Sequence, residues 1–161
     1  MPLLSIASVL DQELQHHPRV VLLCSANRKH PWPAPAGDLY HSEFFRLAKQ
    51  YADQLSPKRL FILSAVHGLV AAEEELAPYT MTMSALGQGD VKSWGKMVAT
   101  QLQEAVHLHR HEVIILGLGR FANPILKHIP QAIAPLVSMT LAQAMQFLRE
   151  QAGTDSHRSG N

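Results

Sequence analysis

Short, continuous apolar runs alternate along the chain with longer segments whose apolar residues recur at helical spacing. Three of the runs are typical of buried parallel strands: RVVLLC at 19–24, RLFILS at 59–64 and EVIIL at 112–116. A weaker run at 131–137 indicates a fourth strand. Because helices and strands alternate, we expect an α/β fold of three layers, in which helices flank a small, mostly parallel sheet.

Segments with apolar residues at helical spacing separate these strands. They predict helices at 4–16, 42–55 and 90–110, with a further helix after residue 140. Residues that typically begin helices mark their starts: Ser42, Asp90, Asn123 before Pro124, and Thr140 with Gln143. The acidic triplet at 73–75 indicates one more short helical turn.

Length and charge bound the class of protein. The 161 residues suffice for one domain, which we expect at 1–152, with a disordered polar tail at 153–161. A net charge of +1 excludes a basic coating for non-specific nucleic-acid binding but leaves room for a local basic patch. The lone Cys24 forms no internal disulfide, and no apolar run is long enough to span a membrane. We therefore expect a cytoplasmic protein without a membrane partner, either a monomer or a weak homodimer.

Polar side chains gather in the loop that follows the first strand. Cys24, Ser25, Asn27, Arg28 and Lys29 stand there in sequence, and their hydroxyl, amide and cations suit the binding of a phosphate or a sugar. Because α/β sheets place ligands at the carboxyl ends of their strands, we expect these residues to bind substrate. A solvated surface loop is the competing interpretation, and Cys24 is more typical of a small buried apolar residue than of a nucleophile.

An acid and an imidazole stand near the same strand ends. Asp38 either caps a helix or provides a carboxylate that activates water and balances positive charge on a sugar ring. The second strand ends at Ser64, and the AVHG turn follows with His67 and Gly68. His67 either caps this turn or donates a hydrogen bond to a leaving base, while Gly68 permits the turn's backbone conformation.

Aromatic and glycine positions complete the candidate binding site. Tyr40 suits stacking on a base, although buried packing is the alternative, and Tyr79 lies in a segment that could cover the site. The GLGRF segment lacks the third glycine of a dinucleotide fingerprint, so we expect no cofactor. Gly117 instead allows close backbone approach, and Arg120 is available for a phosphate. The histidines follow no metal-ligand spacing, so we expect no metal site.

These motifs resemble those of the YaaA-like family. The family carries a cysteine-containing loop after the first strand, then segments of the form PA-x-DLY-x-S, ILSA-x-HGL and PY, which stand here at 35–42, 62–69 and 78–79. The resemblance extends over residues 19–150. The chain departs from the family in having fewer lysines in its first loop and in having Phe121 where a tyrosine is usual.

The YaaA-like family is similar to uracil-DNA-glycosylase-like domains, and one antiphage relative is a DNA glycosylase that acts on glucosylated hydroxymethylcytosine. The resemblance therefore implies a metal-independent N-glycosidase that flips a modified base out of DNA and leaves an abasic site, in antiviral defence. It implies catalysis by Asp38, by Asn27 positioning the base, and by His67 stabilising the departing base. Two alternatives stay open: a non-catalytic DNA-binding stress protein, and a nucleoside or nucleotide N-glycosidase.

Overall fold

Three parallel strands form the centre of the fold, as the apolar runs predict. In this computed structural model, which describes residues 17–158, β1 (Arg19–Cys24) lies between β3 (Arg59–Ser64) and β6 (Glu112–Leu116) and pairs in parallel with both. The last four or five residues of each strand are buried. Their uninterrupted apolar character follows from this burial on both faces of the sheet. The predicted helix at 4–16 lies outside the described residues.

The fourth strand is not the predicted one. It is β4 (Gly68–Ala71), which pairs antiparallel to β3, so the sheet is mixed and has the order β4-β3-β1-β6. The segment 131–137 contributes only one bridge, between Ile133 and β6. Pro135 has no backbone N–H and cannot extend a ladder there. β4 has only four residues, which are too few to show a strand pattern in the sequence, and it begins at Gly68, whose φ of 72° ends the preceding turn.

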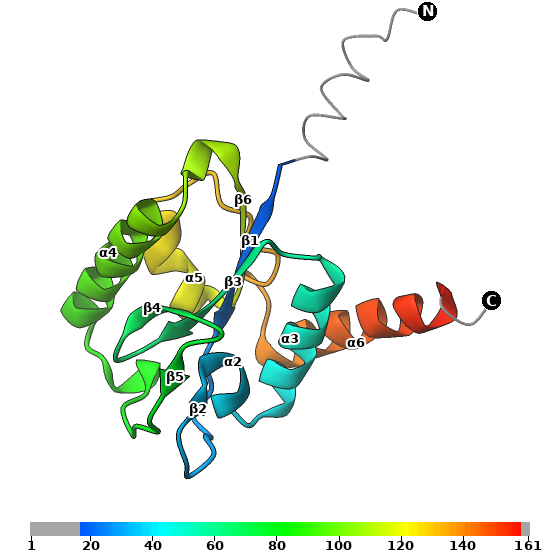
Figure 1. The fold of residues 1–161 in the computed structure, drawn as a ribbon, viewed down its shortest axis with the longest axis horizontal. Helices are drawn as coiled ribbons and strands as arrows, with labels where there is room; N and C mark the ends of the chain where they lie inside the picture. The colour runs from blue at the N-terminus through cyan, green and yellow to red at the C-terminus, as the bar shows by residue number, and fades with distance from the viewer. Residues whose placement is uncertain (1–16, 159–161) are drawn as a thin grey trace, which may run out of the picture.

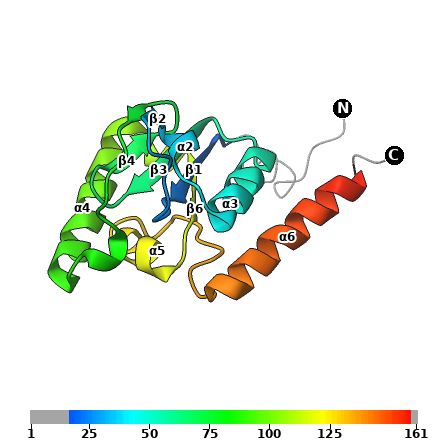
Figure 2. The ribbon, with the colours of Figure 1, turned by 90° about the horizontal axis from the view of Figure 1, so that it is seen from below.

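Helices cover both faces of the sheet (Figure 1, Figure 2). One face carries α4 (Gln88–Ala105) and α5 (Gly119–Leu126), and the other carries α3 (Glu43–Gln54) and α6 (Leu141–Arg158). Neighbouring residues of β1 accordingly enter different cores: Val20 packs on the α4 side and Val21 on the α3 side. The expected α/β fold with helix layers around a small sheet is therefore confirmed. Among the described residues, no helix combines the length and apolar character needed to cross a membrane.

Two of the predicted helix starts are correct. Ser42 caps α3, where its Oγ accepts a hydrogen bond from the Phe45 amide at 3.1 Å. Thr140 and Gln143 form a reciprocal capping box ahead of α6, with distances of 2.9 and 3.2 Å. Such caps are local in sequence, so the pattern of residues is sufficient to locate them.

Other boundaries differ from the prediction. The N-cap of α4 is Gly87, so Asp90 lies inside the first turn, and the helix ends at Ala105 before a short 3-10 turn, η2 (Leu108–Arg110). α5 begins directly after the break that follows β6, and Pro124 therefore lies within it. The acidic triplet leads into β5 (Glu75–Leu76), which pairs with β2 (Ala34–Pro35), and α6 continues beyond the expected boundary at 152.

Candidate functional site

A cluster of hydroxyl groups lies at the carboxyl ends of β1 and β3. The hydroxyls of Tyr40 and Tyr79 are 2.5 Å apart, and Ser64 Oγ donates to the Tyr79 hydroxyl at 2.8 Å. Ser64 is completely buried. Its Oγ also accepts the amides of Val66 and His67, at 3.2 and 3.1 Å. The turn after β3 therefore fixes Ser64, and Ser64 in turn fixes the ring of Tyr79.

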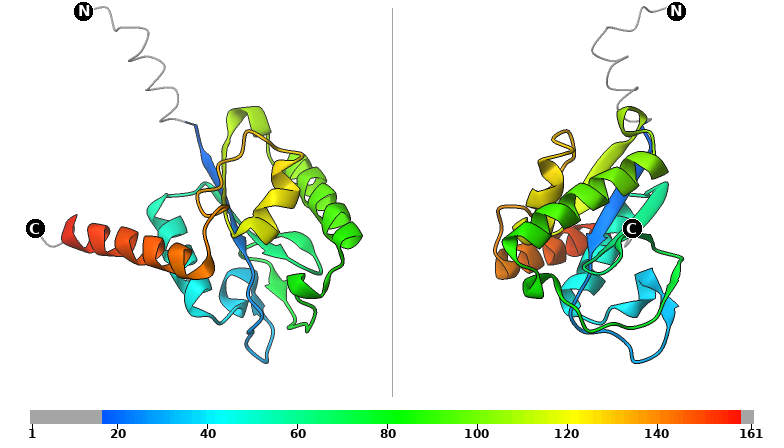
Figure 3. Two further views of the ribbon diagram at one scale, coloured as in Figure 1. Left: turned by 180° about the vertical axis from the view of Figure 1, so that it is seen from behind. Right: turned by 90° about the vertical axis from the view of Figure 1, so that its left-hand side faces the viewer.

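The first loop folds back to bring its cation to this cluster. α2 (Ala36–Leu39), β2 and β5 all lie beyond the carboxyl end of β1 (Figure 3). A backbone bridge joins Lys29 to Tyr40, and the His30 amide donates to the Leu39 carbonyl at 2.9 Å next to it. Two residues that are eleven positions apart in the sequence thereby become direct neighbours.

Lys29 rests on the two tyrosine rings. Its Nζ lies 4.3 Å from the centre of the Tyr79 ring and 5.8 Å from that of Tyr40, and it donates to the Asn27 carbonyl at 3.3 Å. Partial burial lowers the pKa of Lys29. None of the ion pairs that the described residues form includes this amine. The cluster therefore holds a cation that no carboxylate neutralises.

Tyr40 acts as a neutral hydrogen-bonding group. Burial raises its pKa, and the hydrogen bond with Tyr79 raises it further, while the Ser64 and Ser25 hydroxyls oppose this change. Tyr40 is consequently protonated throughout the physiological range. The ring of His67 meets Tyr79 edge-on, with centroids 5.7 Å apart, so this imidazole borders the cluster from the side of the turn.

A small pocket of about 130 Å³ opens beside the cluster. Its wall combines the polar side chains of Ser25, Asn27 and Thr82 with the rings of Tyr79 and Phe121. Arg120 also lines it, and no acidic residue does. The pocket offers hydrogen-bonding groups and ring faces together, which is the chemistry that recognises a planar heterocycle.

The pocket adjoins a larger groove between α4 and α5. This α4–α5 groove has a volume of about 880 Å³, and it shares Met83, Ser84 and Arg120 with the pocket. Its other cations are Lys92, Lys96 and Lys127. We did not predict the two α4 lysines as functional. The sequence did contain a signal for them, because two lysines one helical turn apart repel each other and lower the stability of the helix unless an anion binds between them.

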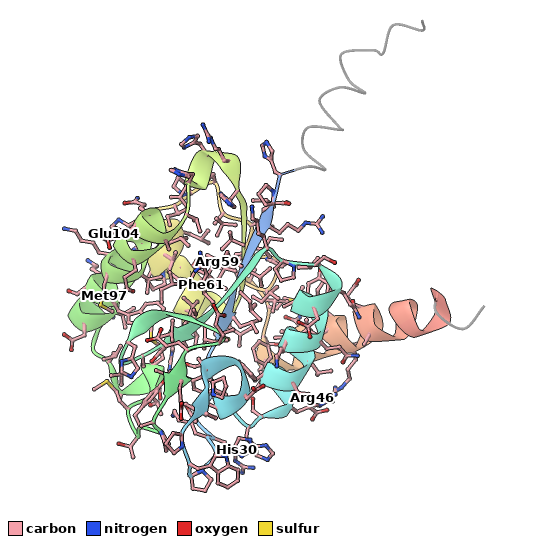
Figure 4. The ribbon with its side chains drawn as sticks, viewed as in Figure 1. His30, Arg46, Arg59, Phe61, Met97 and Glu104 are labelled. Carbon is pink, nitrogen blue, oxygen red and sulfur yellow. The ribbon has the colours of Figure 1, made fainter. Side chains whose placement is uncertain are left out.

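Asp38 lies in a different cleft. It lines a cleft of about 540 Å³ with Arg28 and Arg46, and its Oδ1 accepts a hydrogen bond from Lys49 Nζ at 3.2 Å. The cleft opens at the edge of the molecule where Figure 4 labels His30 and Arg46. The Asp38 side chain is 64% exposed. The structure therefore does not bring Asp38 together with the imidazole at the end of β3, although the sequence predicts one crevice for both.

Cys24 and Gly117 pack against each other under the site. A β-carbon on Gly117 would lie 3.3 Å from Cys24 Cβ, which is a tight contact, so the glycine favours close approach of the two strand ends. The Cys24 side chain is buried, and this burial raises the pKa of its thiol to about 12. Cys24 is thus a packing residue, as its apolar neighbours indicate, and its side chain does not reach the pocket.

In the part of the chain that the structure describes, no three His, Cys, Asp or Glu residues are grouped in a way that could hold a metal ion. A family model described as a family of unknown function, DUF6884, matches residues 20–150, which is most of the chain. No curated protein matches, and no solved structure does.

Proposed function

Because this chain belongs to the DUF6884 family, whose function is unknown, we propose a function from the chemistry of its own site. We propose that the protein is an N-glycosidase that removes a modified base from DNA and leaves an abasic site. We further propose that its fold is uracil-DNA-glycosylase-like. The observation that carries the proposal is a small polar and aromatic pocket that opens into an acid-free basic groove.

The size of the pocket favours a single base. Small-molecule sites usually measure about 300–1,000 Å³, whereas this pocket has about 130 Å³. It accommodates one planar ring, and the sugar and phosphates must then lie outside, at the mouth shared with the α4–α5 groove. A base that has been flipped out of DNA presents this arrangement. A glucosyl group on the base would likewise extend into the mouth.

The residues around the pocket suit heterolysis of an N-glycosidic bond. Ser25 and Asn27 offer a hydroxyl and an amide to the edge of the base, and Tyr79 and Phe121 offer ring faces. When the bond between C1′ and the base nitrogen breaks, its electron pair leaves with the base, and the guanidinium of Arg120, which lines the pocket, opposes the negative charge formed. The oxygen of a water molecule then adds to C1′, and its released proton neutralises the base.

This mechanism differs from the sequence-based one in the role of the acid. Asp38 lines another cleft and is paired with Lys49, so we assign it no part in bond cleavage. We keep Asn27 as the residue that positions the base. His67 acts on the base only through Tyr79, whose ring it contacts, and is therefore a positioning residue in this proposal.

The basic groove also bears on the two alternatives. A free nucleoside carries no phosphate and would make no use of the uncompensated cations beside the pocket. A free nucleotide carries phosphate at one end only, so it would use the cation nearest the pocket and leave the others along the groove without a partner. A non-catalytic DNA-binding protein would use the cations but would not need a hydrogen-bonding pocket of the size of one base. The combination favours an enzyme that acts on a base within a strand.

The decisive experiment measures base release by mass spectrometry. Oligonucleotides with cytosine, hydroxymethylcytosine or glucosylated hydroxymethylcytosine are incubated with the protein, and both the free base and the abasic strand are quantified. We expect release from a modified substrate, with a loss of at least about tenfold in Asn27→Ala, because the loss of one hydrogen-bond donor to the developing charge costs about two to three orders of magnitude.

Asp38→Asn is the matched control, because it changes a polar residue that is also exposed but lines the other cleft. We expect it to release base at the wild-type rate. Loss of release in Asp38→Asn together with full activity in Asn27→Ala would move the reaction to the other cleft. DNA binding without release from any modified substrate would identify the protein as a non-catalytic binder.

A further inference from the structure

The α4–α5 groove carries positive charge on both of its walls. Lys92 and Lys96 stand on α4, whereas Arg120 lies in the first turn of α5 and Lys127 follows its last turn. These four side chains belong to exposed residues, and no ion pair among the described residues includes any of them. Four cations that face one cavity without counterions repel one another, so the groove is ready to bind an anion.

No acid neutralises this charge from the groove itself. The acids of α4 are Asp90, in its first turn, and Glu104, which Figure 4 labels near the end of the helix. Neither lines the groove, and no residue of α5 is acidic. Between the cations the lining combines apolar residues, among them Leu86, Val91 and Pro124, with uncharged polar ones such as Ser93 and Asn123. A chain of phosphates with bases or sugars between them matches such an alternation of charge and apolar surface.

The two helices that wall the groove are in direct contact with each other. Gly95 of α4 faces Pro124 of α5 so closely that a β-carbon would lie 2.6 Å from the proline Cβ. Two helices in such contact leave between them a groove that is bounded by their side chains, and not a broad concave surface. A duplex could contact only the side chains at the outer edges of the α4–α5 groove, whereas a single strand can lie along the groove with cations on both sides.

We propose that the α4–α5 groove binds the phosphodiester backbone of a single strand of nucleic acid. The strand runs to the pocket through the mouth that Met83, Ser84 and Arg120 share, so that one base can enter the pocket. This inference rests on the proposed function only for the fate of that base. It adds the strand preference of the site, namely single-stranded or locally opened DNA over an intact duplex.

Fluorescence anisotropy with a labelled, unmodified oligothymidylate of about twelve nucleotides tests the groove, since single-strand sites span about 4–16 nucleotides. For single strands the logarithm of the affinity falls with that of the salt concentration with a slope of about −0.7 per phosphate contact. Four groove cations therefore predict a slope of about −3. We expect the double variant with Lys92→Gln and Lys127→Gln to lose about half of this slope and at least about tenfold in affinity.

Lys58→Gln is the control for each of the two single substitutions, because it removes one positive charge, as each of them does, from an exposed residue just before the start of β3. This end of the strand is opposite to the end that carries the pocket, so we expect unchanged affinity and slope. A hairpin duplex of equal length should bind at least about tenfold more weakly than the single strand, and circular dichroism checks that each variant is folded.

Several results would overturn the proposal. Unchanged affinity in the double variant, or a loss equal to that of Lys58→Gln, would exclude the groove. Tighter binding of the hairpin duplex than of the single strand would exclude the strand preference. These outcomes are separable from failure of the proposed function. Base release with groove-independent binding defeats this inference alone, whereas groove-dependent binding without base release defeats the enzyme assignment alone.

Discussion

Gly95 sets how closely α4 approaches α5, and its replacement by alanine has a calculable cost. A β-carbon at this position would lie 2.6 Å from Pro124 Cβ and 2.7 Å from the proline carbonyl carbon, and real β-carbons almost never come closer than 3.0 Å to a neighbour. The first of these atoms belongs to the proline ring and the second to the backbone, so neither can rotate away from the new β-carbon. The Gly95→Ala variant must therefore move one helix relative to the other.

Two opposing effects determine the size of the change. Overpacking of a well-filled contact costs about 1–3 kcal/mol. Alanine is better than glycine inside a helix by about 0.5–1 kcal/mol, which partly offsets that cost. We expect Gly95→Ala to lower the free energy of unfolding by about 1–2 kcal/mol, since steric exclusion by the α5 backbone outweighs helix propensity.

Urea denaturation measures this loss, with Gly89→Ala as the control. Gly89 lies in the same helix, but nothing surrounds the position of its β-carbon within 4 Å. Gly89→Ala should therefore keep or raise the stability, by up to about 1 kcal/mol. The midpoint should shift without a change in the denaturant slope if the helices only separate slightly. A Gly95→Ala variant at least as stable as the wild type would refute the close packing of α4 on α5.

Two further predictions concern the buried groups beneath the site. Ser64→Ala removes the only hydrogen-bond acceptor that the structure gives the Val66 and His67 amides in this turn, so the free energy of unfolding should fall by about 1–3 kcal/mol; an unchanged urea midpoint would contradict this role. The Cys24 thiol should resist iodoacetamide at about pH 8 in the folded protein and react in urea, because burial raises its pKa. Since folding raises this pKa from 9.0 to about 12, the stability should decline as the pH rises above 9.0, and Cys24→Ala should show a smaller decline.

The candidate site illustrates which features local reasoning can reach. Lys29 and Ser64 were predicted from their positions near strand ends, Tyr40 as a ring that stacks on a base and Tyr79 as part of a covering segment, and the structure brings all four into one cluster. The carboxyl ends of parallel strands meet at one edge of a sheet, so this grouping follows from the topology. The same reasoning placed Asp38 at this edge of the sheet. The structure places it in another cleft, because the short helix α2 carries it toward α3 and Lys49.

The α4–α5 groove could not be located in the same way. Lys92 and Lys96 stand on a helix that the sequence does predict, yet their partners across the groove follow a different strand. The contact of Gly95 with Pro124 defines which faces of the two helices look at each other. Neither residue carries a sequence signal for the other, and Pro124 was even expected to begin a helix rather than to lie within one.

The sequence by itself determined the three buried strands and the caps of α3 and α6, because these depend on neighbours a few residues away. Only the tertiary structure decided the antiparallel edge strand, the separation of Asp38 from the tyrosine cluster, and the basic groove. The physical reason is that hydrophobic burial selects which surfaces meet, whereas the composition of a surface does not reveal which surface it will face.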